Sequence, residues 1–108
     1  MAKERLLIIE DEPSVATQLK WSLDREYDIA VAGDAGKAEK LLATGDFPVA
    51  TLDLGLPPAA DTTEEGFRLL EAIGRIAPGT KVIVLTGNSG QDNAVKAVAL
   101  GAADFCPK

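Results

Sequence analysis

The segment VATLDLGLPP, residues 49–58, contains an apolar run that carries one carboxylate. Pro48 precedes the run, and Gly55 with two prolines ends it, so the pattern predicts a short, fully buried strand of a parallel sheet. Asp53 stands near the end of this strand. In open α/β sheets, ligands and chemistry lie beyond the carboxyl ends of the strands, so Asp53 is placed to react. From this segment alone, a carboxylate that only braces the following loop is an equally good interpretation.

Composition limits the chain to one domain and excludes several classes of partner and site. The chain has 108 residues, of which 46% are hydrophobic and 26% are charged, enough for one core and too few for a second domain. Its net charge of -6 argues against a nucleic-acid surface and suits a site that attracts cations. Cys106 is the single cysteine and there is no histidine, so we expect no disulfide and no zinc cluster, and a buried Cys106. No apolar run is long enough to span a membrane and residues 1–5 start no secretory core, so we expect a cytoplasmic location.

Apolar runs and amphipathic stretches alternate along the chain. The expected strands are residues 6–9, 27–32, 49–53, 81–85 and 104–106. The expected helices begin at Pro13, after Asp34, at a Thr62–Glu65 capping box and after Asp92. We expect Gly45 to end the second helix in a left-handed conformation and Gly101 to end the fourth. This alternation predicts a parallel sheet with helices on both faces.

Polar side chains stand at the carboxyl ends of four of these strands. They are Glu10, Asp11, Asp53, Thr86 and Lys108. Parallel strands bring their carboxyl ends to one edge of the sheet, so these groups should converge. Three neighbouring carboxylates repel one another unless a cation joins them, and a hard cation with oxygen ligands, Mg²⁺ above all, meets that need. Thr86 and Lys108 add a hydroxyl and a positive charge suited to a phosphoryl group.

With these residues, the sequence resembles the receiver domain of a two-component response regulator. The resemblance runs from about Leu6 to Lys108 and is carried by short motifs, which are Glu10-Asp11, Asp53, Leu56-Pro57, Thr86-Gly87, Gly101-Ala102, Asp104-Phe105 and Lys108. It implies a flavodoxin-like α/β fold, a doubly wound parallel five-stranded sheet of order 2-1-3-4-5. The sequence lacks that fold's last helix. We therefore expect residues 1–108 to be a receiver domain truncated at its C-terminus, with the output domains outside this chain.

The resemblance also implies a role for each site residue. Asp53 would be the phosphoacceptor, Thr86 and Lys108 would bind the phosphoryl oxygens, and Thr86 with Phe105 would form the switch. The implied Mg²⁺ ligands are Glu10, Asp11, Asp53 and the backbone carbonyl of Gly55. The implied function is a phosphorylation-activated switch, which takes its phosphoryl group from a sensor histidine kinase and controls a downstream output such as transcription.

Several further expectations concern partners and activity. Besides the kinase, we expect an output domain in the full-length protein, no nucleic-acid contact by this segment and no membrane contact, with homodimerisation left open. We expect no enzymatic activity beyond promotion of the chain's own phosphorylation and dephosphorylation. Segments 19–21, 31–34, 51–58 and 85–88 resemble, more narrowly, the regulators of the PEP-CTERM exopolysaccharide system. Those regulators carry an ATPase domain that acts on an alternative sigma factor and a DNA-binding domain.

The sequence departs from the family pattern at several points. The spacing from Asp53 to Gly66 is longer than usual, with residues 58–63 resembling an insertion, and Glu10 stands where Asp is commoner. Without a last helix, we expect Leu7, Ile8 and the apolar side of the fifth strand to be less shielded from solvent.

Two other classes of function remain open from the residues. A haloacid-dehalogenase type of phosphatase also combines an Asp nucleophile with Thr, Lys and Mg²⁺, but it needs a second acid two residues after the nucleophile, where this chain has Gly55. A nucleotide-binding or purely structural α/β domain is the other alternative. Residues 33–36 and 87–90 both lack a phosphate-binding fingerprint, which disfavours nucleotide binding.

Overall fold

Five parallel strands form one sheet in the order β2-β1-β3-β4-β5, which confirms the predicted topology. The computed structural model describes residues 3–56, 63–86 and 91–107. The elements are β1 (Glu4–Ile9), α1 (Pro13–Leu23), β2 (Tyr27–Ala32), α2 (Ala35–Thr44), β3 (Val49–Asp53), α3 (Glu64–Ile76), β4 (Lys81–Thr86), α4 (Gln91–Ala99) and β5 (Asp104–Pro107). β1 begins two residues earlier than expected because its pairing with β2 extends back to Glu4 and Tyr27.

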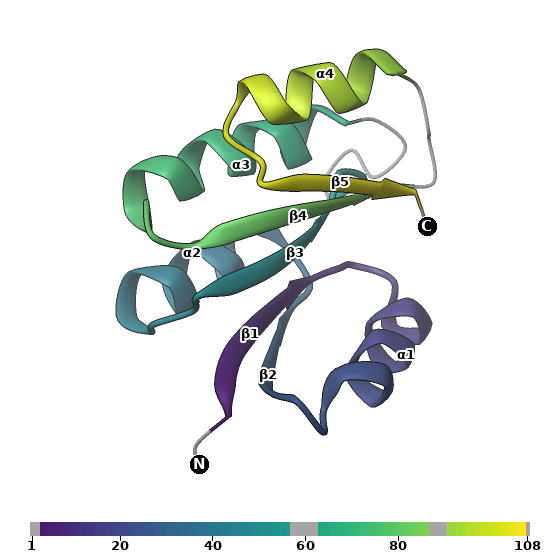
Figure 1. Cartoon of the computed structure of the whole chain (residues 1–108), viewed down its shortest axis with the longest axis vertical. Coiled ribbons are helices and arrows are strands. Elements are labelled where there is room, and N and C mark those ends of the chain that lie inside the picture. The colour runs from purple at the N-terminus through teal and green to yellow at the C-terminus, as the bar shows by residue number, and fades with distance from the viewer. Residues whose placement is uncertain (1–2, 57–62, 87–90, 108) are drawn as a thin grey trace.

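The helices cover the two faces of the sheet unequally. Figure 1 shows α1 beside β1 and β2 on one face, with α2, α3 and α4 on the other. The side chains between the sheet and these three helices form one apolar cluster, which includes Ile9, Leu52, Phe67, Ile73 and Val84. None of the helices in the described part of the chain is long and apolar enough to cross a bilayer.

Less shielding was expected for Leu7, Ile8 and the apolar side of the fifth strand, and only the fifth strand shows it, at Cys106. Leu7 and Ile8 have 0% exposure, so the expectation was wrong for these two residues. β1 lies between β2 and β3, with helices on both of its faces, and its side chains alternate between the two. The partly exposed apolar side chains on the α1 face are instead those of Val49, Ile83, Leu85 and Cys106, on β3, β4 and β5. Cys106 is therefore half-buried rather than buried.

The ends of α2 agree with the sequence in one case and differ in the other. The side chain of Asp34 accepts a hydrogen bond of 2.8 Å from the Lys37 N–H, which confirms the predicted N-cap. Gly45 has φ of -113°, so the predicted left-handed conformation was wrong. Glycine is needed there for another reason, because a Cβ would lie 2.8 Å from the Phe47 ring. Gly101, with φ of 108°, does adopt the left-handed conformation.

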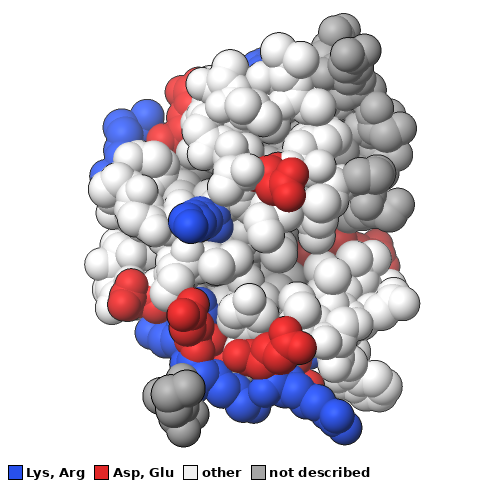
Figure 2. All heavy atoms as spheres, in the orientation of Figure 1, with Lys and Arg blue, Asp and Glu red and all other residues white. Residues whose placement is uncertain are grey.

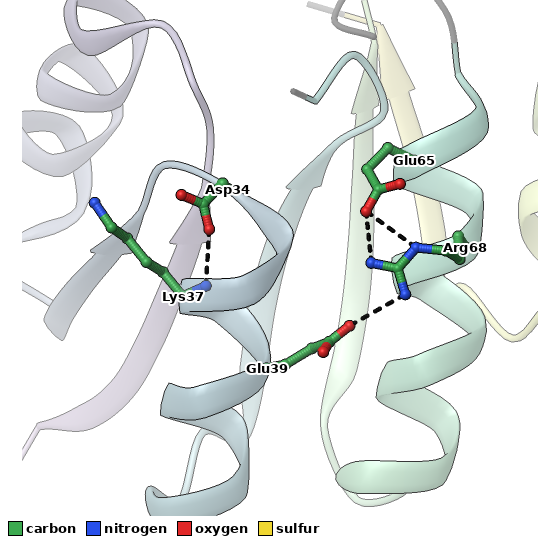
Figure 3. A network of polar contacts seen from close by, with 5 residues as sticks. All are labelled: Asp34, Lys37, Glu39, Glu65 and Arg68. Atoms are coloured by element: carbon green, nitrogen blue, oxygen red, sulfur yellow. Dashed lines mark hydrogen bonds and ion pairs between the residues drawn. The ribbon is translucent and has the colours of Figure 1, made fainter. Parts of the chain in front are cut away.

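The starts of α3 and α4 also differ from the sequence pattern. α3 begins at Glu64, and Thr63 before it makes no side-chain cap bond; Thr62 lies outside the described residues. Glu65 instead accepts hydrogen bonds from Arg68, which also contacts Glu39 on α2 (Figure 3). The predicted capping box includes Thr62, so it stays a prediction.

α4 begins at Gln91, so Asp92 lies inside the helix rather than before it. Acidic residues are favourable in the first turn of a helix as well as at the N-cap. The sequence pattern alone therefore does not tell which of the two positions Asp92 takes.

Candidate functional site

Three carboxylates meet at the carboxyl edge of the sheet, as the topology predicted. Glu10 and Asp11 directly follow β1, and Asp53 is the last residue of β3. β1 and β3 are neighbours, with Ile9 opposite Leu52, so the next residue of each strand reaches the same place. Each of the three side chains offers an oxygen, and these atoms all lie within 4.8 Å of one another.

Burial makes this cluster chemically distinctive. The side chains of Glu10 and Asp53 are 3% and 8% exposed, and Asp11 is half-buried. Acidic residues are rarely this buried unless other groups balance their charge. The donor set consists only of carboxylate oxygens, which hard cations such as Mg²⁺ prefer to nitrogen or sulfur ligands. The residues present therefore fit a Mg²⁺ ion.

A tight turn orients the Asp53 carboxylate. The Gly55 N–H donates a hydrogen bond of 3.1 Å to Asp53 Oδ1. The Leu56 N–H donates to the Leu54 carbonyl, also at 3.1 Å, which closes a three-residue turn. Leu54 and Leu56 are both 0% exposed, so the core anchors the turn on each side of Gly55. The role of the Gly55 carbonyl as a metal ligand stays a prediction.

Two of the remaining predicted site residues, Thr86 and Phe105, lie on β4 and β5. Leu85 is the partner of Asp53 in the sheet, so the backbone of Thr86 lies one residue beyond it, at the end of β4. The Thr86 side chain and the whole of Lys108 lie outside what the structure describes. Phe105 is opposite Val84 and packs, partly buried, against the apolar cluster beneath α2, α3 and α4.

Thr51 is a neighbour of the site that sequence reasoning missed. It lies two residues before Asp53 on β3, so both side chains start from the same face of the strand. Its side chain is 8% exposed, and its hydroxyl has no hydrogen-bond partner within the described part of the chain. The signal in the sequence was a polar residue inside the apolar run that leads to Asp53.

Charge on the visible surface is mixed. Figure 2 shows that Lys and Arg side chains gather mainly toward the end that carries the N-terminus, with Asp and Glu among them. Most of the same face over α4 and β5 is uncharged (Figures 1 and 2).

Comparison with known sequences gives a consistent family. The family model described as "Response regulator receiver domain" matches residues 6–108. The chain is 33% identical over 105 residues to the alginate biosynthesis transcriptional regulatory protein AlgB of Pseudomonas putida, an alignment that covers 96% of this chain and 22% of that protein. The chain thus spans about a fifth of the length of this relative.

Solved structures agree with this match. A CheY-like response regulator receiver domain protein from Methanospirillum hungatei has a TM-score of 0.88 and 30% identity, covering 99% of this chain and 82% of its own. A Burkholderia pseudomallei response regulator with a phosphorylated aspartic acid, a calcium ion and citrate has a TM-score of 0.86 and 28% identity. The match covers 98% of this chain and 60% of that one. The response regulator TrrA from Thermotoga maritima, in complex with Mg²⁺ and BeF, has a TM-score of 0.82 and 26% identity. The match covers 97% of this chain and 86% of that one. None of these comparisons tests the narrower resemblance to PEP-CTERM regulators.

Proposed function

Because this chain belongs to the response regulator receiver domain family, we propose that Asp53 accepts a phosphoryl group from a sensor histidine kinase in a Mg²⁺-dependent reaction. Receiver domains are signalling domains that are phosphorylated on aspartate and control transcriptional output. One observation carries the assignment to Asp53. Its carboxylate ends β3 and lies with those of Glu10 and Asp11, with oxygens within 4.8 Å of one another.

The proposed step transfers a phosphoryl group between two proteins. An Asp53 oxygen attacks the phosphorus of the kinase's phosphohistidine, a P–O bond forms, the P–N bond breaks, and the nitrogen keeps the electron pair. The product is an acyl phosphate on Asp53. The switch is reset by hydrolysis: water attacks the phosphorus, inorganic phosphate leaves, and the Asp53 carboxylate is regenerated.

The chain's own residues prepare this step. Glu10, Asp11, Asp53 and the Gly55 carbonyl would hold Mg²⁺, which when bound would supply positive charge to offset that of the carboxylates and the phosphoryl group. The Gly55 N–H restrains the Asp53 carboxylate, which reduces the orientational freedom lost on reaction. Thr86 and Lys108 would bind the phosphoryl oxygens.

The proposed output is a change of packing. Phosphorylation would draw the Thr86 hydroxyl toward Asp53, and Phe105 would turn into the space left behind, repacking the surface between α4 and β5. The half-buried position of Phe105 against the apolar cluster supports this role, since a ring there has a buried and a more exposed side.

The wider setting is part of the same proposal. We assign residues 1–108 to a receiver domain, with an output domain elsewhere in the full-length protein. The name of the AlgB relative supports a transcriptional output. A cytoplasmic location, the PEP-CTERM system and the lack of activity beyond self-phosphorylation and dephosphorylation remain predictions within it.

The test is labelling of the chain by acetyl phosphate with and without Mg²⁺. We expect one Mg²⁺-dependent acyl phosphate that Asp53→Asn abolishes, because an amide is not a nucleophile. Asp46→Asn is the matched control, since Asp46 is exposed and lies before the start of β3, at the opposite edge of the sheet. Full labelling of the Asp53→Asn chain would overturn the assignment. Continuous phosphate release would favour a phosphatase, and no reaction would favour a structural domain.

A further inference from the structure

The first turn of α3 approaches the backbone that follows Asp53 very closely. Gly66 is buried in this turn, and a Cβ built on it would lie 2.4 Å from both the Cα and the carbonyl oxygen of Leu54. The carbonyl carbon of Leu54 would be 2.8 Å away, whereas real Cβ atoms essentially never come within 3.0 Å of such atoms. All three are backbone atoms, so no side-chain rotation relieves the overlap. The two segments can be this close only because residue 66 has no side chain.

The backbone that Gly66 touches belongs to the turn that orients Asp53. The Leu54 carbonyl accepts the Leu56 N–H and closes the turn, and between them the Gly55 N–H donates to Asp53 Oδ1. Leu54 and Leu56 are fully buried, so the turn has little room to move away from α3. A displacement of Leu54 would therefore also displace the Gly55 amide relative to the Asp53 carboxylate.

We propose that Gly66 is a positioning residue for the carboxylate site. Its bare α-carbon allows α3 to seat against Leu54, and this contact holds the turn of residues 53–56 in the geometry with which Asp53 binds Mg²⁺ and accepts a phosphoryl group. The inference rests on the function proposed above. It also gives the long spacing between Asp53 and Gly66 a structural meaning, because Gly66 meets the turn directly although it lies 13 positions further along the chain.

The same helix provides a matched control. Gly74 is exposed on α3, and a Cβ built there would meet no atom within 4 Å. Alanine has a higher helix propensity than glycine, so both Gly66→Ala and Gly74→Ala should gain helix stability from this effect. They differ in the contact with Leu54. The double variant combines the stabilising change at residue 74 with the Gly66→Ala change, which displaces the turn.

The experiment measures the site in folded protein. The unaltered chain, both single variants and the double variant are compared in trimethylamine N-oxide, which favours the folded state. Three quantities are followed: the Mg²⁺ dissociation constant by calorimetric titration, the rate of labelling by acetyl phosphate, and the amide resonance of Gly55 without metal. A purely structural role would change the stability but leave the Mg²⁺ affinity of the folded chain unchanged.

With Gly66→Ala we expect Mg²⁺ affinity to fall by about 10- to 100-fold, as when a supporting partner of a metal ligand is lost. Labelling should slow and the Gly55 resonance should shift. Gly74→Ala should match the unaltered chain, and the double variant should keep the weak affinity. Unchanged affinity and labelling in Gly66→Ala would overturn the inference.

Failure of Gly66→Ala to fold, alone and with Gly74→Ala, would also overturn it, since the inferred displacement is confined to the turn. If the unaltered chain neither bound Mg²⁺ nor became labelled, the proposed function would fail instead. An unshifted Gly55 resonance in metal-free Gly66→Ala would then still count against the positioning role.

Discussion

Lys96 on α4 places its ammonium nitrogen 4.6 Å from the centre of the Phe67 ring on α3. Phe67 is buried, whereas Lys96 is exposed, so the charge stays in solvent above the ring. Ala97 on the same helix is buried, whereas Val95 and Val98 are 65% and 60% exposed. The cation–π contact therefore adds to the apolar packing that attaches α4, the helix next to the proposed switch surface.

Removing the charge at residue 96 should loosen α4. Lys96→Met keeps an unbranched apolar side chain, and we expect the free energy of unfolding to fall by about 0.5–1 kcal/mol, the value of an exposed cation–π pair. Urea denaturation measures this, and hydrogen exchange should show faster exchange in α4. Lys37→Met on α2 is the control, since Lys37 is also exposed. Equal losses in the two variants would argue that only general charge effects are involved.

The acidic pair after β1 should control metal affinity. Glu10→Gln and Asp11→Asn should each weaken Mg²⁺ binding by at least about tenfold, because even the partners of metal ligands have effects of that size. Without metal, either change should raise the melting temperature, since it removes repulsion from Asp53. Glu12→Gln is the control, because Glu12 is exposed and outside the cluster of three carboxylates. Mg²⁺ titrations with the same affinity in all three variants would show that the cluster does not bind the ion.

Two threonines should respond oppositely to replacement by valine. The buried hydroxyl of Thr51 has no partner within the described residues, so Thr51→Val should raise the free energy of unfolding by about 1–2 kcal/mol. The Thr80 hydroxyl donates to the Phe47 carbonyl at 2.6 Å, so Thr80→Val should lower it by about 1 kcal/mol. Chemical denaturation of both variants gives the two signs. A destabilised Thr51→Val would mean that the hydroxyl does have a partner in solution.

Acid should weaken the ion pair between Glu65 and Arg68 within α3. Hydrogen bonds from Arg68 hold the pKa of Glu65 below its ordinary value of 4.5, and the same bonds raise the pKa of Arg68. Because the folded state lowers the pKa of Glu65, the stabilisation is complete above about pH 4.5 and is lost as the pH falls through the lower folded value. The effect should be small, since 53% of the Arg68 side chain is exposed.

Glu65→Gln tests this contact directly. Below pH 4.5, the ordinary pKa of a Glu side chain, the urea midpoint of the unaltered chain should fall. The midpoint of the variant should fall less. Glu71→Gln, at an exposed position of the same helix, is the control and should keep the decline. Superimposable pH profiles for the Glu65→Gln variant and the unaltered chain would contradict the prediction.

The sequence predicted most of the architecture because local patterns carry it. Apolar runs and helix signals located all nine elements in the described part of the chain, and the direction of parallel strands was enough to bring Glu10, Asp11 and Asp53 together. The sheet order came from the family resemblance, and the structure confirmed it. The errors were at helix ends, such as Gly45, where caps and packing compete within one or two residues.

The sequence by itself thus determined the order of the elements and the edge at which the carboxylates gather, because both depend on chain direction and side-chain periodicity. Only the tertiary structure decided which apolar side chains remain partly exposed, such as Ile83 and Leu85 in place of Leu7 and Ile8. It alone revealed the contact of Gly66 with Leu54, and a Thr51 hydroxyl that has no partner among the described residues. Such features depend on the distances between close-packed elements far apart in the chain, and no local pattern of residues encodes those distances.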